Sequence, residues 1–102
     1  MSHVLLTADA EESRVDIWLH VAVDSPTAAD RLMTRIDDKC RLYATHPHMG
    51  ALRPDLGPQV RCFSVGNYVV IYRPIEDGIV VLLVIHGSRD IPTVFRDLFR
   101  RS

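Results

Sequence analysis

The residues with the clearest chemical potential follow a run of seven apolar residues. Residues 79–85 are all aliphatic, and the chain then continues as His-Gly-Ser-Arg-Asp at 86–90. An imidazole can exchange a proton near neutral pH, and a guanidinium binds phosphate or carboxylate groups. The run predicts a central strand buried on both faces, which ends where the sheet meets solvent. Gly87 then allows the chain to turn, and Asp90 can cap a following helix.

The other histidines and the cysteines give weaker signals for chemistry. His46 and His48 suggest a metal site, but no third ligand lies at a useful spacing. Cys40 and Cys62 have no metal-type spacing, and two cysteines are few for a secreted domain held together by disulfides. We therefore expect reduced, packed thiols, no metal and no cofactor.

Composition and charge limit the class of protein. The chain has 102 residues, 47% of them hydrophobic and 25% charged, which is typical of one soluble globular domain. Twelve basic residues balance 13 acidic ones, so direct sequence-specific binding to nucleic acid is not expected. No segment reaches the ~18 apolar residues of a membrane span, and no signal-like segment opens the chain. These patterns predict a cytoplasmic protein without a membrane partner.

The first half of the chain predicts a strand and two helices. Residues 3–10 begin as a short strand, and acidic residues at 9, 11 and 12 then favour the start of a helix that runs to about Asp24. Ser25 and Pro26 suit the N-cap and the first position of a second helix, which ends before His46. The short break between the two helices predicts an antiparallel hairpin. Three prolines and two glycines make residues 46–58 an irregular connector.

The second half predicts three strands and a short helix. Gly66-Asn67 suits a two-residue hairpin turn between strands 60–65 and 68–74, and Asp77-Gly78 suits a second turn before the apolar run. Residues 94, 95, 98 and 99 are apolar at helical spacing. The predicted fold class is therefore α+β, with an N-terminal strand and an antiparallel helical hairpin packed on an antiparallel β meander, and a short C-terminal helix.

These turns assign the strand side chains to two faces of the sheet. The first register pairs Val65 with Tyr68, and the second pairs Val69 with His86. The first face then carries Phe63, Val65, Tyr68, Val70, Tyr72, Leu83 and Ile85, together with Arg61. The second face carries Val60, Cys62, Val69, Ile71, Leu82 and Val84, with Ser64, Arg73 and His86 towards its edges. The helical hairpin can cover only one face, so we expect the second, under the short C-terminal helix, to stay partly open and to bind a partner.

Four segments together carry a resemblance that covers nearly the whole chain. They are "ADAEESRVDIW", "HPHMGALRPDL", "VRCFSVGNYVVIYRPIEDGIVVLLVIHGSRD" and the terminal helix. In these segments and in its order of elements, the chain resembles the RelE/ParE superfamily of bacterial toxins from type II toxin-antitoxin modules. The resemblance implies a toxin that a cognate antitoxin, ParD-like or similar, holds inactive in a hetero-oligomer. The superfamily contains ribosome-dependent messenger-RNA endonucleases, the RelE branch, and ParE-type poisons of DNA gyrase.

The catalytic positions of the RelE branch distinguish the two activities. That branch has two lysines on the strand after the connector, an arginine after the hairpin tyrosine, an arginine before the last helix and a tyrosine within that helix. The residues at the matching positions are Val60, Cys62, Val69, Arg89 and Phe95. Only Arg89 matches, so it is the one candidate catalytic residue, and the groups needed to activate a 2′-hydroxyl are missing. The resemblance thus favours binding to DNA gyrase, with the ribosome-dependent endonuclease or a non-toxic binding module as alternatives.

Two sets of residues are candidates for binding. The target-binding candidates are His86, Arg89, Arg73 and Arg96. The antitoxin-binding candidates are Val60, Cys62, Val69, Ile71, Val84 and Phe95, across which a disordered antitoxin segment would fold as it binds. Structural roles remain open for several charged groups: His86 can cap the strand end, Arg89 can pair with Asp90, and Arg61 can form a buried ion pair with Asp16.

Overall fold

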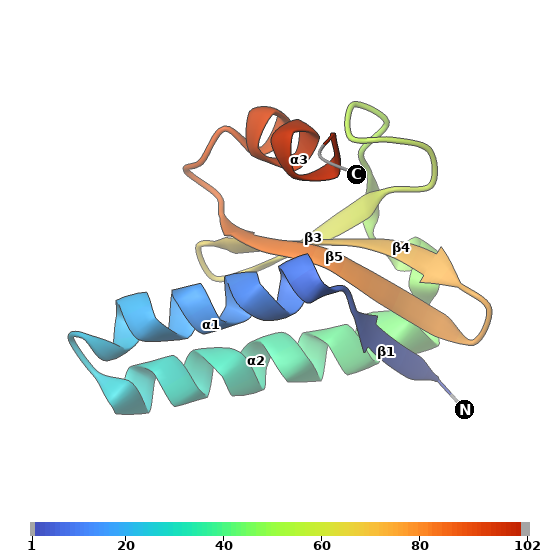
Figure 1. Ribbon diagram of the computed structural model, residues 1–102. Helices are drawn as coiled ribbons and strands as arrows, with labels where there is room; N and C mark the ends of the chain where they lie inside the picture. Colours follow the sequence, from blue (N-terminus) through green and yellow to red (C-terminus); the bar gives the residue numbers. More distant parts are fainter. Residues whose placement is uncertain (1, 101–102) are drawn as a thin grey trace.

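A five-stranded sheet with helices on both faces forms the protein (Figure 1). The computed structural model describes residues 2–100. Its elements are β1 (His3–Leu6), α1 (Ala8–Ala22), α2 (Pro26–Thr45), the 3-10 helix η1 (Pro47–Met49), β2 (Ala51–Leu52), β3 (Arg61–Val65), β4 (Tyr68–Ile75), β5 (Gly78–His86) and α3 (Ile91–Phe99). The strand order is β1-β5-β4-β3-β2, with β1 parallel to β5 and the other neighbours antiparallel. The predicted α+β class is confirmed, and the short strand β2 is an addition to it.

Side-chain caps fix the start of each α-helix. Thr7, Ser25 and Asp90 each accept a hydrogen bond from the backbone N–H three residues later, at 3.1, 3.1 and 3.4 Å. Each cap satisfies a donor that the first turn of a helix leaves unpaired. The predicted caps Ser25 and Asp90 are confirmed, and α1 begins at Ala8 with Asp9 and Glu11 in its first turn, as its acidic residues indicated.

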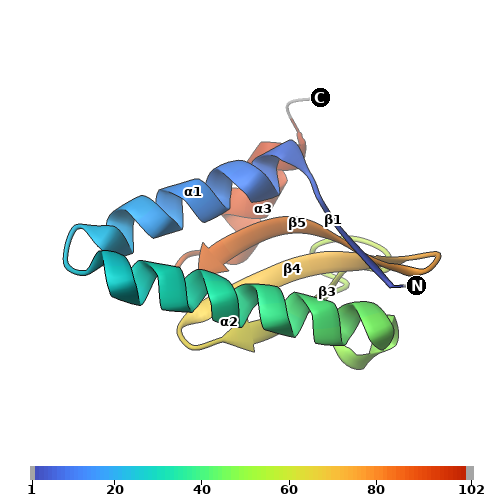
Figure 2. The same cartoon turned by 90° about the horizontal axis from the view of Figure 1, so that it is seen from below.

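The helical hairpin covers one face of the sheet (Figure 2). The buried core between the helical hairpin and the sheet contains Ala10, Ile36, Cys40, Ala44, Phe63, Val65, Val70, Tyr72, Ile79, Val81 and Val84. The Tyr43 ring of α2 stacks on Phe63 with the ring centroids 4.0 Å apart, so the hairpin is fitted to the aromatic strand positions. The first strand hairpin has the predicted register, and the predicted face of its side chains is confirmed for β3 and β4.

The turn between β4 and β5 differs from the predicted one. It consists of Glu76-Asp77, with Asp77 at φ 66°, and Gly78 is already the first residue of β5. Gly78 lies opposite His3 of the neighbouring strand, and a Cβ at position 78 would overlap the His3 backbone. The glycine is therefore needed for the close approach of β1, and the prediction of an Asp77-Gly78 loop was wrong.

A bulge in the β4–β5 pair shifts the register again. Ile71 lies opposite Leu83 instead of Val84, with Leu82 as the extra residue. Val84 therefore belongs to the core under the helical hairpin, while Leu83 and Ile85 belong to the core under α3. The predicted faces of these three residues were wrong, because a register change of one residue moves every side chain to the opposite face. The predicted pairing of His86 with Val69 was wrong for the same reason, since His86 lies opposite Tyr68.

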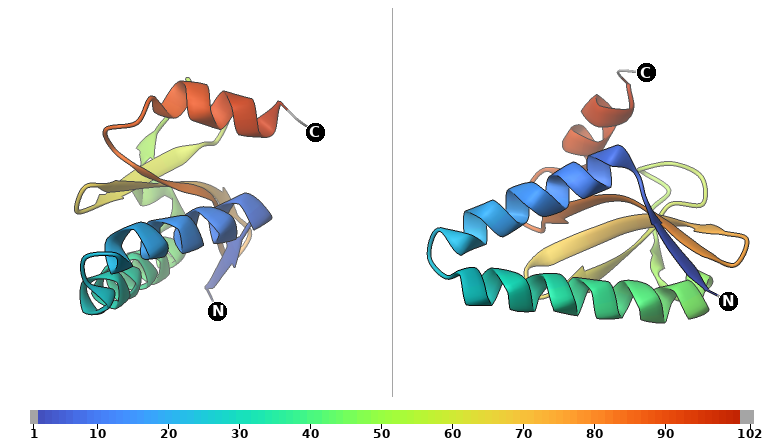
Figure 3. Two further views of the ribbon diagram at one scale, coloured as in Figure 1. Left: turned by 60° about the vertical axis from the view of Figure 1, so that its left-hand side comes forward. Right: turned by 60° about the horizontal axis from the view of Figure 1, so that its bottom comes forward.

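The second face of the sheet is closed by α3, which lies across it with the connector beside it (Figure 3). Its buried residues are Val60, Ile71, Leu82, Leu83, Ile85, Ile91 and Phe95, each no more than 8% exposed. Leu56 of the connector and Val94 and Leu98 of α3 pack against them. The expected apolar patch is reduced to the partly exposed Cys62 and Val69, because the connector and α3 together cover what α3 alone could not.

A buried tyrosine attaches the connector to the sheet. The Tyr72 hydroxyl donates to the Pro47 carbonyl oxygen at 2.7 Å and accepts from the Gly50 N–H at 3.0 Å. Tyr72 is fully buried, and this burial raises the pKa of its hydroxyl. Gly50 has no room for a side chain, because a Cβ there would overlap the tyrosine ring and hydroxyl.

We expect Tyr72→Phe to lower the free energy of unfolding in urea by about 1–3 kcal/mol, because the buried Gly50 N–H and the partly buried Pro47 carbonyl lose their partner. The raised pKa means that Tyr72 stabilises the fold below its unfolded pKa of about 10 and that this contribution is lost as the pH rises further. The difference between the two proteins should therefore shrink above that pH. Tyr43→Phe keeps the stacked ring and is the control; equal losses in both variants would contradict the assigned role.

Candidate functional site

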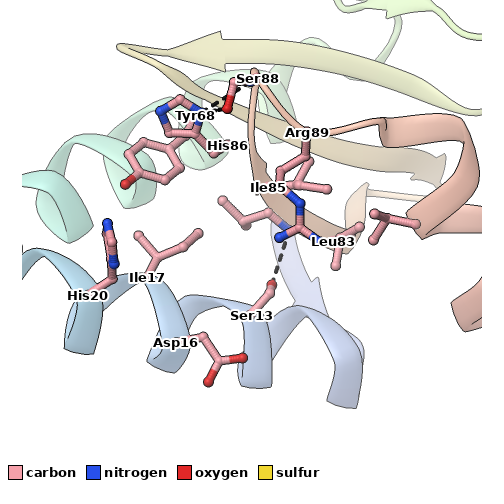
Figure 4. Close-up of a pocket in the computed structure, with 12 residues that line it drawn as sticks. Ser13, Asp16, Ile17, His20, Tyr68, Leu83, Ile85, His86, Ser88 and Arg89 are labelled. Carbon is pink, nitrogen blue, oxygen red and sulfur yellow. Dashed lines mark hydrogen bonds between the residues drawn. The ribbon is translucent and has the colours of Figure 1, made fainter.

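The main pocket lies between the C-terminal half of β5, the helix α1 and the turn that leads to α3 (Figure 4). Its volume is about 550 Å³. The lining residues are Ser13, Asp16, Ile17, His20, Tyr68, Leu83, Val84, Ile85, His86, Ser88, Arg89 and Val94. The pocket thus contains His86 and Arg89, which the sequence singled out.

His86 is fixed in place by the turn that follows it. Its Nδ1 accepts from the Ser88 N–H at 3.1 Å and lies 2.7 Å from the Ser88 Oγ, and its ring meets Tyr68 edge to face at 5.1 Å. Because a backbone donor points at Nδ1, the neutral imidazole carries its proton on Nε2. The predicted role of His86 in capping the strand end is confirmed, and Nε2 is the nitrogen left to contact a ligand.

The edge of β5 within the pocket is held by side chains instead of a strand. The Ser13 Oγ accepts from the Val84 N–H at 3.1 Å and donates to the Ala10 carbonyl oxygen at 2.8 Å. The Thr7 hydroxyl donates to the Leu82 carbonyl oxygen at 3.1 Å. These contacts join α1 to β5 at the point where β1 has ended.

The opposite wall of the pocket comes from α1. Ser13, Ile17 and His20 lie three to four residues apart and share a helix face, with Asp16 beside them. The sequence analysis treated α1 only as packing and missed these residues, although a polar residue at each turn beside an apolar stripe was a usable signal. Arg89 extends over the space between β5 and this wall (Figure 4).

Arg89 is available for a ligand. Within residues 2–100 it forms no salt bridge, because its neighbour Asp90 caps α3 and accepts from the Thr93 hydroxyl at 2.8 Å. The suggested Arg89–Asp90 pair is thus not formed. An exposed guanidinium, a fixed imidazole and a carboxylate around an apolar floor suit binding of a peptide or a polar side chain.

The other two target-binding candidates lie elsewhere. Arg96 lines a shallow hollow of about 400 Å³ between α3 and the connector, together with Asp55 and Arg100. Arg73 is exposed on β4 opposite Val80 and lines neither hollow. The four candidates therefore do not come together in one site.

The six antitoxin-binding candidates do not form one open surface. Val60, Ile71 and Phe95 are buried in the core under α3, and only Cys62 and Val69 remain partly exposed on that side. Val84 lies on the opposite face of the sheet and is 2% exposed. Antitoxin binding through these residues stays a prediction, although the surface on which it was based is closed.

Arg61 has a structural role that differs from the expected ion pair. Its guanidinium donates to the carbonyl oxygens of His48 and Gly50 at 2.9 and 2.8 Å, while Asp16 lies in the main pocket. Its Nε is buried and has no hydrogen-bond partner. Arg61 therefore fastens the connector to β3.

Two further pKa shifts have structural causes. The Arg53 guanidinium donates to the Asp55 carboxylate at 2.8 and 3.0 Å and lowers the pKa of Asp55. Burial raises the pKa of the Cys40 thiol to about 11, and both Cys40 and Cys62 are free thiols. In the part of the chain that the structure describes, no three His, Cys, Asp or Glu residues form a group that could hold a metal ion, and no helix there could cross a membrane.

Comparison with known proteins agrees with this geometry. A solved structure described as the chromosomal ParDE TA system from P. aeruginosa has the same fold, with a TM-score of 0.69 and 21% sequence identity. The match covers 84% of this chain and 96% of that chain. A search of curated proteins found no match.

The sequence itself matches the family described as the ParE toxin of the type II toxin-antitoxin system, parDE, over residues 4–91. The chain therefore belongs to the ParE toxin family. Membership of a ParDE system also implies an antitoxin as partner.

We expect Ser13→Ala to lower the free energy of unfolding by about 1–3 kcal/mol, because the buried Val84 N–H loses its acceptor. Hydrogen exchange should show faster opening of β5 at Val84 than in the unaltered protein. Ser64→Ala, at an exposed position of β3, is the control and should change neither quantity. Unaltered exchange at Val84 in Ser13→Ala would show that the hydroxyl does not hold this edge.

Proposed function

We propose that this toxin acts in the cytoplasm by binding DNA gyrase and that an antitoxin encoded beside it neutralises it. Two observations support the proposal. The chain belongs to the ParE family, and it has different side chains at most of the positions of the RelE branch's catalytic residues. The proposal describes inhibition by contact and requires no bond to be broken by the toxin.

The observation that carries the proposal is the packing of two of those positions. Val60 and Phe95 stand where the RelE branch has a lysine and a tyrosine, and they are 4% and 7% exposed within the core under α3. An aliphatic chain and a phenyl ring cannot activate a 2′-hydroxyl or protonate a leaving oxygen. Arg89 alone could stabilise charge on a phosphate, which is insufficient for the cleavage reaction.

The exposed surface around the end of β5 is the proposed contact with the target. His86, Ser88 and Arg89 are exposed, and hydrogen bonds of the turn before α3 fix the His86 ring, Ser88 and the Arg89 backbone. An arginine in a fixed turn can bind an acidic partner surface without losing much conformational freedom. Arg96 and Arg73 extend the basic character of this half of the chain, although they lie outside the pocket.

A test of the target compares gyrase and the ribosome directly. Purified toxin should inhibit plasmid supercoiling by DNA gyrase, and its expression should raise a DNA-damage reporter without cutting messenger RNA in ribosomes. Arg89→Ala should weaken inhibition about tenfold, the effect of losing one charged hydrogen bond, whereas Arg31→Ala on the exposed surface of α2 should not. Messenger-RNA cleavage that Arg89→Ala abolishes would replace this proposal with the ribosome-dependent endonuclease, and unimpaired growth would favour the non-toxic binding module.

The antitoxin, in this proposal, contacts the exposed side of α1. Val15 and Leu19 of α1 and Val23, its C-cap, repeat every four residues and are 57, 55 and 84% exposed. Glu12 and Asp16 flank them, so the surface suits an amphipathic segment with basic flanks.

Leu19→Asp should weaken the complex with the antitoxin at least tenfold in a calorimetric titration, because a carboxylate replaces a buried apolar contact. Leu42→Asp is the matched control on α2, where the leucine is 49% exposed. Circular dichroism should show that both variants are folded. Equal affinity of the two variants would exclude this face of α1.

A further inference from the structure

The outer edge of β5 is paired with a strand over only its first half. β1 pairs with residues 78–81, and its pairing ends just before the extra residue Leu82. Beyond this point, Thr7 binds the Leu82 carbonyl oxygen and Ser13 binds the Val84 N–H. The strand itself continues to His86, so its last residues have no neighbouring strand on this side.

Two backbone groups at this edge point into the main pocket. In an antiparallel pair, the N–H and C=O of alternate residues point away from the partner strand. The Val84 N–H points to Ser13 on α1, so the Val84 carbonyl and the His86 N–H point the same way. The His86 carbonyl is already used, because it accepts from the Arg89 N–H at 3.0 Å. The Val84 carbonyl oxygen and the His86 N–H therefore remain to bind a ligand. Their spacing matches the N–H and C=O groups of an extended backbone.

The walls of the pocket provide contacts for alternate side chains of such a backbone. Ile17 and Ile85 supply an apolar surface, whereas Arg89 supplies a cation above it (Figure 4). Asp16 and His20 line the α1 side. An extended segment with an aliphatic residue next to an acidic one would fit this alternation, since successive side chains of a strand point in opposite directions.

We propose that an extended segment of the antitoxin adds to β5 at this edge as a short strand. It would bind the Val84 carbonyl and the His86 N–H through its backbone, with an aspartate or glutamate on Arg89 and an aliphatic residue on Ile17 and Ile85. A helix could not make these contacts, because its backbone groups are already bonded internally. The inference rests on the proposed function, in that it requires an antitoxin, and it is independent of whether the target is gyrase.

The test uses the full chain and the purified product of the adjacent gene. In the complex, the His86 amide should exchange with deuterated solvent at least tenfold more slowly than in the free toxin. Arg89→Gln should raise the dissociation constant about tenfold, and Arg31→Gln, exposed on α2, should leave it unchanged. His20→Trp places a large side chain in the pocket and should weaken binding similarly, with Arg31→Trp as its control.

The outcomes separate this inference from the broader proposal. A tight complex in which the His86 amide exchanges as in the free toxin, or in which the segment beside β5 is helical by its chemical shifts, would overturn the added strand and leave the toxin-antitoxin assignment intact. If the product of the adjacent gene does not bind the toxin at all, the proposed antitoxin partnership fails and this inference fails with it.

Discussion

The burial of β5 on both faces is the constraint on which the other elements depend. Six of its aliphatic residues are no more than 6% exposed, and burying each contributes about 1.5–3 kcal/mol. A strand that is apolar on both sides needs a cover on both sides. The helical hairpin supplies one cover and α3 with the connector supplies the other, so the layer order follows from the composition of this one strand (Figure 3).

The main pocket begins beside the bulge at Leu82. It lies just beyond the point where β1 stops pairing, and from there α1 flanks the strand through Ser13. A helix cannot continue a ladder of backbone hydrogen bonds, so a gap remains between α1 and the end of the strand. The pocket is therefore a consequence of ending β1 early, and His86 and Arg89 lie at its rim because the strand ends there.

The sequence predicted features whose causes are local. Ser25 and Asp90 were found as helix caps and Gly66-Asn67 as a turn, because each depends on neighbours within three residues. Gly78 was misinterpreted because its reason is the approach of His3, far away along the chain. That error moved the pairing by two residues and left the faces unchanged, whereas the bulge at Leu82, which has no local signal, exchanged the faces of residues 83–86. The α1 wall of the pocket was missed for the same reason, since only the tertiary fold brings that helix beside β5.

The cover over the second face also buries two of the positions that distinguish the RelE branch in the sequence. A lysine or tyrosine at a cleavage site must reach solvent and substrate, whereas Val60 and Phe95 lie in the buried cluster that also contains Ile71 and Leu83. A charged group in that position would be buried at a high cost in free energy. Sealing this face therefore stabilises the fold and keeps Val60 and Phe95 away from solvent. The exposed side of α1 and the end of β5 still present apolar, backbone and charged groups to solvent, which is why the proposed contacts with partners lie there.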